Sequence, residues 1–226
     1  MGFCHSLPES MNIACHLSPD GKTMNPTNKS WKEVSIPPAL AKRPKDIRGI
    51  PIPFVAMVDD SGKPHFTVND TSKVSFVLHN DLCGLCGLKN YRWRWFVGGP
   101  ISAFNPNGMY LDPPMHWDCL HYALQVCPYL ALKKYHEIPY ESMVGRIDPK
   151  TLATNEMTKD HAMIKSNPVL LVVIKASGTK ILYPGQTKTK PRTPYVSVEY
   201  WQWGRRLPDE KGRALVPPDL RPEDFL

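Results

Sequence analysis

The chain has 226 residues, a formal net charge of +7 and a sequence pI of about 9.1. This length suffices for one sizeable domain or two small ones with a hydrophobic core, and the basic balance favours an anionic partner. The longest apolar run, 168–174, is too short to cross a bilayer, so we expect no membrane-spanning segment. Four of the six cysteines fall between Cys83 and Cys127, and no signal peptide is recognisable, which predicts reduced cysteines in a cytoplasmic protein.

The first part of the chain divides into an arm and the start of a core. Residues 1–45 have little hydrophobic periodicity and predict an extended arm. In the following region, 46–135, the β-favouring segments 53–58 and 65–68 flank strong turn chemistry. Asp70 or Thr71 is then placed to cap a short helix that leads to Cys83.

Two further elements are expected in this core. Bulky and charged residues alternate over 91–97, and Gly98-Gly99-Pro100 follows, so we predict a β-hairpin whose second strand covers 101–104. Apolar residues recur at helical spacing from His116 to about residue 134. Pro128 interrupts this pattern, which predicts a break or kink near Val126.

The C-terminal half predicts β-structure and then a tail. Segments 169–176 and 180–183 flank Ser177-Gly178-Thr179 and predict a second hairpin, with a further strand at 195–203 beside it. We therefore expect a β-rich part over 136–206, packed on the core, and a charged, proline-rich tail over 207–226.

Two pairs of zinc-type ligands are the most specific feature of the sequence. Cys83-Gly-Leu-Cys86 is followed, after 29 intervening residues, by His116-Trp-Asp-Cys119. Four soft ligands in two such pairs suit a tetrahedral zinc ion. A glycine follows each cysteine of the first pair and lets the backbone turn tightly around a metal. The second pair falls in the first turn of the predicted helix. The sequence therefore predicts a zinc site made by these four side chains.

Helical geometry separates the candidates for the second pair. His116 and Cys119 lie three residues apart, which is about 4.5 Å of helical rise, so both can reach one ion. Cys127 lies eight residues beyond Cys119, about 12 Å along a continuous helix, and is expected to be a small buried side chain. It replaces His116 as a ligand only if Pro128 breaks the helix early.

The expected zinc is structural. Four protein ligands leave no open position for water, which favours a folding role and a protein without catalytic residues. The alternative is an HNH-type metal-dependent nuclease, which the chain resembles through Cys83-x-x-Cys86 alone. That family needs a histidine on the strand after the knuckle, and residues 89–97 contain none. Its catalytic roles are therefore not transferred to this chain.

Several short motifs occur together over residues 44–135. They are RGIPIPFV at 48–55, CxxCG at 83–87, FVxGP at 96–100, PPxHxxC at 113–119 and CPYL at 127–130. In this combination the chain resembles a group of uncharacterised proteins from bacteria and their phages, with a treble-clef-like CxxC…HxxC zinc core. The resemblance implies a bacterial or phage setting and supplies no activity. The expected fold is α+β: a treble-clef-like zinc knuckle, β-hairpin and helix, packed with further β-hairpins and long proline-rich loops.

Basic residues in two stretches give the first functional hypothesis. The two stretches are Lys89, Tyr91, Arg92 and Arg94, and then Lys188, Lys190 and Arg192. Cations interleaved with aromatic rings suit phosphate contact combined with base stacking. The sequence thus predicts a zinc-stabilised nucleic-acid-binding protein whose partner is DNA or RNA. The same alternation also fits a strand with Trp93 and Trp95 in the core and the arginines in solvent.

A protein partner is the alternative to a nucleic acid. The proline-rich arm and tail could wrap another protein, for instance a host enzyme bound by a phage factor, with Trp201 and Trp203 as exposed anchors. The HNH-like nuclease is the second alternative.

Overall fold

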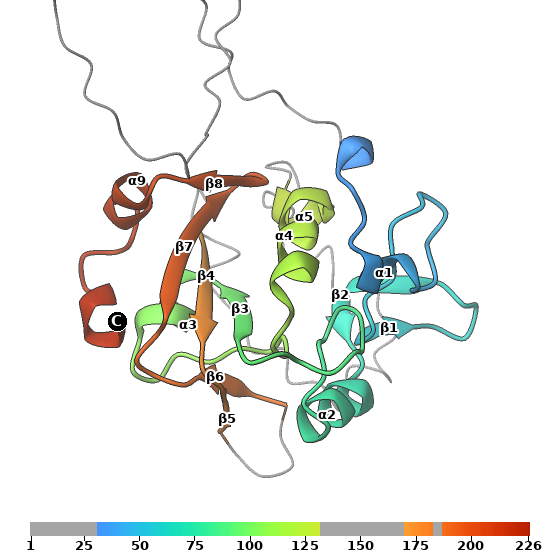
Figure 1. Cartoon of the computed structure of the whole chain (residues 1–226), viewed down its shortest axis with the longest axis horizontal. Coiled ribbons are helices and arrows are strands. Elements are labelled where there is room, and N and C mark those ends of the chain that lie inside the picture. The colour runs from blue at the N-terminus through green and yellow to red at the C-terminus, as the bar shows by residue number, and fades with distance from the viewer. Residues whose placement is uncertain (1–30, 132–169, 183–186) are drawn as a thin grey trace, which may run out of the picture. The chain divides into compact units, whose positions relative to one another are not determined.

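The computed structural model describes residues 31–131, 170–182 and 187–226 (Figure 1). Within them the chain is a mixed α and β structure with several small sheets. Its elements in chain order are η1 Trp31–Glu33, α1 Pro38–Ala41, β1 Ala56–Val58, β2 Pro64–Asn69, α2 Thr71–His79, β3 Arg94–Gly98, α3 Pro100–Phe104, α4 Trp117–Val126, α5 Pro128–Ala131, β4 Leu171–Ala176, β5 Thr179–Ile181, β6 Thr189–Pro191, β7 Ser197–Gln202, β8 Arg205–Leu207, α9 Asp209–Ala214 and η3 Pro222–Phe225. None of the described helices is long and apolar enough to cross a membrane.

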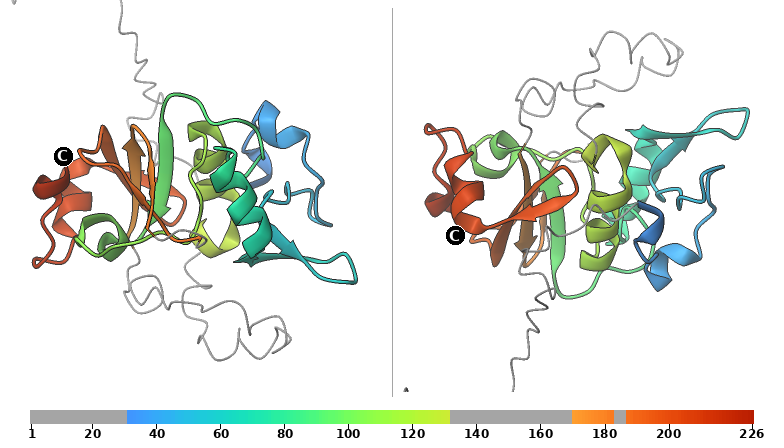
Figure 2. Two further views of the ribbon diagram at one scale, coloured as in Figure 1. Left: turned by 90° about the horizontal axis from the view of Figure 1, so that it is seen from below. Right: turned by 90° about the horizontal axis from the view of Figure 1, so that it is seen from above.

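A four-stranded antiparallel sheet in the order β3-β4-β7-β8 separates two hydrophobic cores. Successive residues of a strand point to opposite faces. Trp95 and Val173 therefore join the first core, which contains α4, whereas Phe96 and Ile174 join the second core, which contains α3 and the C-terminal segment. Figure 2 shows the sheet between these two layers. Because β4 is covered on both faces, it is an almost continuous apolar run.

The hairpin expected at 91–104 is absent, and this prediction is wrong. The strand β3 forms, but Pro100 opens helix α3 instead of completing a turn, since proline suits the first position of a helix. The partner of β3 is the distant β4, with Val97 opposite Val173. The prediction of a second hairpin at 169–183 is also wrong, because its two strands pair with other strands. β4 lies in the central sheet, and β5 pairs with β6 in a separate two-stranded sheet.

Several elements that were predicted from residues close together in the sequence form as predicted. Strands β1 and β2 pair as an antiparallel hairpin, and the strand expected at 195–203 is β7, which lies beside β4. The carboxylate of Asp70 caps α2 by accepting the backbone N–H groups of Ser72 and Lys73. Helix α4 ends at Val126, and Pro128 begins α5, so the predicted break is present.

The expected arm and tail both contribute to the cores. Leu40, from the expected arm, is 3% exposed and packs in the first core. Leu220 and Phe225, from the expected tail, are buried in the second core. Residues 45 and 207 therefore do not mark structural boundaries among the described residues. Residues 1–30 of the arm, with Cys4 and Cys15, and residues 132–169 lie outside the described part.

One ionisable pair lies inside the first core. The Glu199 carboxylate is 3.1 Å from Nε2 of His121 and accepts a hydrogen bond from the indole N–H of Trp201 at 2.9 Å. Burial raises the pKa of Glu199, and these two contacts with the charge of Arg206 outweigh it, so that the pKa lies below its ordinary value.

Trp201 is 6% exposed and Trp203 is half-buried against the same core. The expectation that they are exposed partner anchors is therefore wrong.

Candidate metal centre and the basic surface beside it

The first ligand pair is carried by a tight turn between α2 and β3. The backbone N–H of Gly87 donates to the Cys83 carbonyl at 2.8 Å, and the N–H of Cys83 donates to the Leu88 carbonyl at 2.8 Å. Gly87 has φ +77, and a Cβ at this position would lie 2.4 Å from the ring of Phe54. Both its conformation and its packing therefore require glycine. The turn predicted around the metal is confirmed at this residue.

The second ligand pair lies at the start of α4. His116 is the N-cap of this helix, with extended backbone, and Cys119 is its third residue. This position turns the His116 ring back towards the knuckle, so that residues three apart reach one point, as the spacing predicts.

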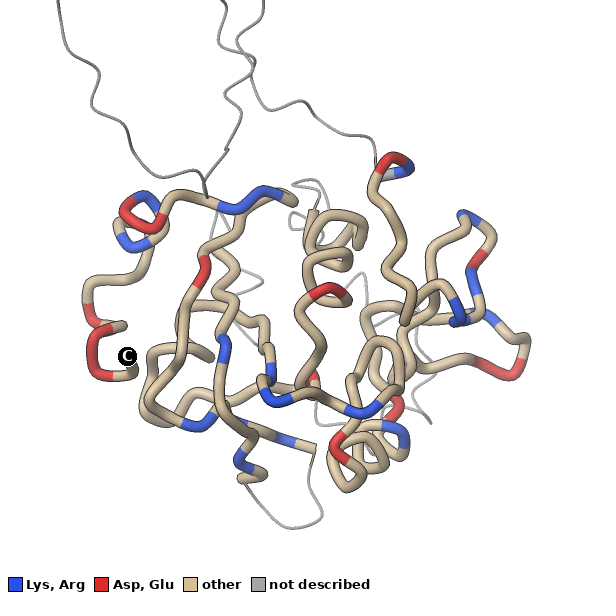
Figure 3. Tube along the Cα trace, in the orientation of Figure 1, with Lys and Arg blue, Asp and Glu red and all other residues tan. Residues whose placement is uncertain are grey.

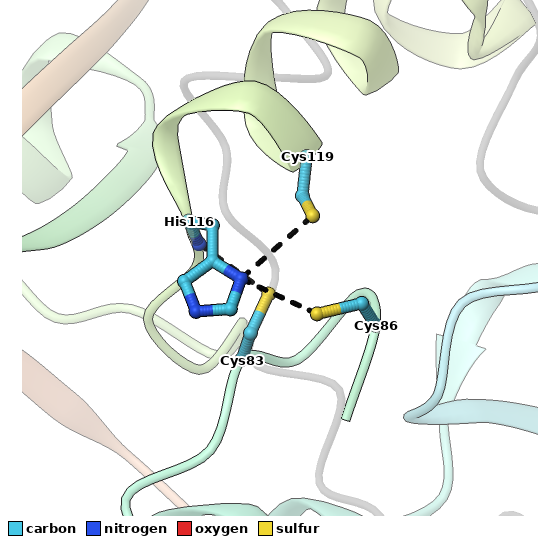
Figure 4. A group of neighbouring side chains, drawn as sticks. All are labelled: Cys83, Cys86, His116 and Cys119. Atoms are coloured by element: carbon cyan, nitrogen blue, oxygen red, sulfur yellow. Dashed lines mark hydrogen bonds between the residues drawn. The ribbon is translucent and has the colours of Figure 1, made fainter. Parts of the chain in front are cut away.

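All four predicted ligands converge (Figure 4). Their ligand atoms lie within 4.8 Å of one another, and each residue is buried. Nδ1 of His116 is 3.3 Å from Sγ of Cys86 and 3.9 Å from Sγ of Cys119. A tetrahedral ion with zinc–sulfur and zinc–nitrogen bonds of the usual length places such ligand atoms about 3.5–3.8 Å apart. The cluster could therefore hold a metal ion.

Hydrogen bonds around the cluster set which atoms face the centre. Nε2 of His116 lies 2.9 Å from the Lys89 carbonyl, to which it donates, and in the neutral imidazole this leaves Nδ1 as the unprotonated atom that faces the thiols. The backbone N–H of His116 donates to Sγ of Cys83 at 3.3 Å. The carboxylate of Asp118, which lies between the two ligands of the second pair in the sequence, is exposed. The Lys89 carbonyl has no sequence signal, because every residue supplies a backbone carbonyl.

The cluster favours ionised sulfur at Cys83. Burial opposes ionisation of Cys83, but hydrogen bonds with Cys119 and Cys86, and that from the His116 amide, leave its pKa well below its ordinary value. The contacts with Cys83 and then Cys86 raise the pKa of Cys119, since neighbouring thiols share protons. Burial lowers the pKa of Arg43 and the charge of Cys86 opposes this shift, which places a cation within electrostatic reach of the thiols. A dication would replace the shared protons.

Cys127 takes no part in this cluster. It ends α4, where its backbone N–H donates to the Ala123 carbonyl at 2.8 Å, and its thiol is free. The described cysteines form no disulfide. Of the two candidates for the fourth position, His116 lies in the cluster and Cys127 does not.

The first basic stretch lies next to the metal cluster, but only part of it faces solvent. The ring of Tyr91 is 71% exposed and stacks on that of His116, with centroids 4.5 Å apart. The guanidinium of Arg92 lies 4.7 Å from the centroid of Trp93, and the Lys175 ammonium lies 5.0 Å from it. Arg94 is instead 16% exposed and paired with Asp81. We refer to Tyr91, Arg92, Trp93 and Lys175 as the aromatic–basic face.

Lys89 and Arg94 are committed to other groups within the protein. Nζ of Lys89 donates to the Asn80 carbonyl at 2.9 Å, although its side chain is 70% exposed. Nε of Arg94 donates to the carboxylate of Asp81 at 3.1 Å. Trp95 is 9% exposed, as the strand interpretation of this segment expects, whereas Trp93 is half-buried.

The second basic stretch borders two hollows. One, of about 320 Å³, includes both Arg94 and Arg192 in its walls, so residues from the two stretches meet there. The other, of about 760 Å³, includes Lys190 and again Arg192. Lys188 lines neither hollow. Sequence reasoning missed Lys175, Lys180 and Arg221 on this surface, because each is an isolated cation outside a basic run.

No known family model, curated protein or solved structure matches this chain.

Proposed function

We propose that the cluster binds Zn²⁺ with a structural role. Three thiolates and one imidazole in tetrahedral reach are a donor set typical of structural zinc sites, and all four positions are filled by protein. The order of elements supports a treble-clef-like arrangement, since the knuckle is followed by β3 and then by the ligand-bearing helix α4. Trp95 and Met115 exchange both backbone hydrogen bonds, at 3.1 and 2.8 Å, directly before α4. This bridge stands where a treble clef has its hairpin.

We further propose that the protein binds nucleic acid, in the bacterial or phage setting that the resemblance implies. One observation carries this proposal: a cation from the segment before β3 and a cation of β4 lie beside the same half-buried ring, and an exposed ring precedes them in the chain. Arg92 and Lys175 flank Trp93, and Tyr91 is exposed next to them. Cations contact phosphates, and exposed rings stack on bases, so the aromatic–basic face suits this class of ligand.

The alternatives have weaker support. The tryptophans suggested as anchors for a protein partner are buried or half-buried. A nuclease needs a histidine base near its knuckle, and the nearest one, His116, is a metal ligand in the proposed site.

Fluorescence anisotropy with labelled single-stranded DNA, single-stranded RNA and duplex DNA tests the binding function. The variant Lys175→Gln is compared with Lys63→Gln, which removes an equal charge from the exposed β1–β2 turn. Tyr91→Ala removes the stacking ring, and its zinc content is measured in parallel because this ring contacts His116. We expect about 5–150-fold weaker binding for Tyr91→Ala, the range given by one base–ring stack. Equal effects of the two lysine variants, or no salt-sensitive binding to any of the three ligands, refute the proposal.

A further inference from the structure

The larger hollow has a wall rich in cations. It lies among the β5–β6 ribbon, the loop after α3 and the C-terminal segment, and its volume is about 760 Å³. Lys180, Lys190, Arg192 and Arg221 line it, and we call it the basic hollow. Figure 3 shows Lys and Arg positions along β5 and β6. The strand pairing places Lys180 directly opposite Lys190, so two like charges face each other across this ribbon.

The charges of the basic hollow are not balanced within it. No ion pair joins any of its four cations to an acid among the described residues. Asp219 and Asp224 also line the hollow, which leaves four positive against two negative charges, a net +2. Nζ of Lys190 donates to the Pro106 carbonyl at 2.6 Å and is thereby fixed in place. Burial and the like charge of Lys180 both lower the pKa of Lys190, and a bound anion would relieve this repulsion.

The apolar part of the basic hollow does not offer rings for stacking. Phe104 and Phe225 line it but are 1% and 8% exposed, because they belong to the second core. The net positive charge of this wall therefore favours an anionic group and not a stacked base. Tyr91, by contrast, is 71% exposed. The surface thus separates a place suited to bases from a place suited to phosphates.

Arg192 connects the two places. It lines the basic hollow and also the smaller hollow that contains Arg94. Its backbone N–H donates to the Gly178 carbonyl at 3.0 Å. Gly178 is three residues beyond Lys175 of the aromatic–basic face, a span of about 10 Å at most. Cations therefore continue from Trp93 through Lys175 and Arg192 to the basic hollow.

We propose that the basic hollow binds backbone phosphates of a single-stranded nucleic acid whose bases stack on the aromatic–basic face. This inference rests on the proposed nucleic-acid binding and adds the strand type and the place of the phosphates. Single strands are favoured because their bases are free to stack on protein rings, whereas the bases of a duplex are already stacked on one another.

The test compares three variants of the full chain. Lys180→Gln/Arg221→Gln removes two exposed cations of the hollow, and Lys63→Gln/Lys211→Gln removes two exposed cations that line neither hollow. The third variant, Asp219→Asn/Asp224→Asn, removes the two acids. Binding of a single-stranded 12-mer is measured by anisotropy at several salt concentrations. Amide shifts in ¹H–¹⁵N spectra are followed with the same 12-mer, a nucleoside monophosphate and inorganic phosphate.

Loss of two phosphate contacts lowers the slope of log affinity against log salt by about 1.4 for a single strand. The loss of affinity caused by Lys180→Gln/Arg221→Gln is then about sevenfold larger at 50 mM than at 200 mM salt. We expect the control pair to have no such effect, the acid variant to bind more tightly, and the 12-mer to shift the amides of Lys190 and Arg192.

The outcomes separate this inference from the proposed function. A 12-mer that binds and shifts Tyr91 and Arg92, but has equal affinity for the hollow and control variants, overturns the inference and leaves the function intact. Mononucleotide or phosphate that shifts the hollow amides while no 12-mer binds overturns both, since the site then serves a free phosphate compound. Tighter binding of duplex than of single strand refutes the assigned strand type.

Discussion

The most direct test of the metal centre replaces two cysteines of the same helix region, one at a time. Cys119 belongs to the cluster, whereas Cys127 ends the helix outside it. Serine at either position exchanges a thiol for a hydroxyl of similar size. The difference between Cys119→Ser and Cys127→Ser therefore reports the metal and not the general cost of altering a cysteine.

The expected magnitude follows from linkage between metal binding and folding. With free zinc about 1,000-fold above its dissociation constant, binding to the folded state alone contributes about 4 kcal/mol. A unit of this size shifts its melting temperature by roughly 2–4 °C per kcal/mol, so Cys119→Ser should melt about 8–16 °C lower. Cys127→Ser loses only local packing and should cost about 1 kcal/mol.

Metal content and thermal unfolding are measured on the same preparations. Wild type and Cys127→Ser should each contain one zinc per chain, and Cys119→Ser should contain little. A chelator should lower the melting temperature of the first two proteins and leave that of Cys119→Ser almost unchanged. Equal zinc content in the two variants, or a wild type that does not respond to chelator, would refute the assignment of the cluster.

Two further predictions concern packing and pH. Gly87→Ala and Gly62→Ala share the cost of a positive φ, but only Gly87 has a ring within contact distance, so chemical denaturation should show an additional cost of about 1–3 kcal/mol for Gly87→Ala. Equal costs would contradict the described knuckle. Because the folded state lowers the pKa of Glu199, its contribution is present above the ordinary value of 4.5 and is lost as pH falls through the folded value. Glu199→Gln should therefore be less stable than wild type at pH 7, and the difference, followed by denaturation at a series of pH values, should shrink below pH 4.5. A difference that stays constant down to pH 2 would show that the contacts of His121 and Trp201 with this carboxylate contribute nothing.

The metal ligands could be predicted from the sequence because their signal is local. Within each pair, the spacing of Cys83 and Cys86, or of His116 and Cys119, sets the geometry through one turn of backbone. Only the meeting of the two pairs is non-local, and a shared metal ion would require it. The cap at Asp70 was predictable for the same reason, since a side chain and the N–H groups it accepts lie within three residues.

The hairpins predicted at 91–104 and 169–183 did not form, because the pairing partners of these strands are decided by burial of residues far apart in the sequence. Gly98 and the residues after it are typical of a turn. β3 nevertheless pairs with β4, because this pairing buries more apolar surface: β4 is covered on both faces. A run such as 170–174 contains no mark of which strand will lie beside it. The ion pair of Arg94 could not be predicted from the sequence either. It depends on the position of Asp81, which has a left-handed backbone conformation just after α2.

The candidate metal centre and the proposed binding surface share structural supports. Nε2 of His116 donates to the Lys89 carbonyl, and the His116 ring stacks on the ring of Tyr91. This proposed metal ligand therefore positions both ends of the segment 89–91. At the other end of this stretch, Arg94 is fixed by Asp81 and its charge is already balanced. Because Arg94 thus serves the fold, the proposed nucleic-acid contact would fall to the side chains between these two supports and to the cations of the neighbouring strand. A zinc that takes no part in chemistry would still determine where the first base stacks.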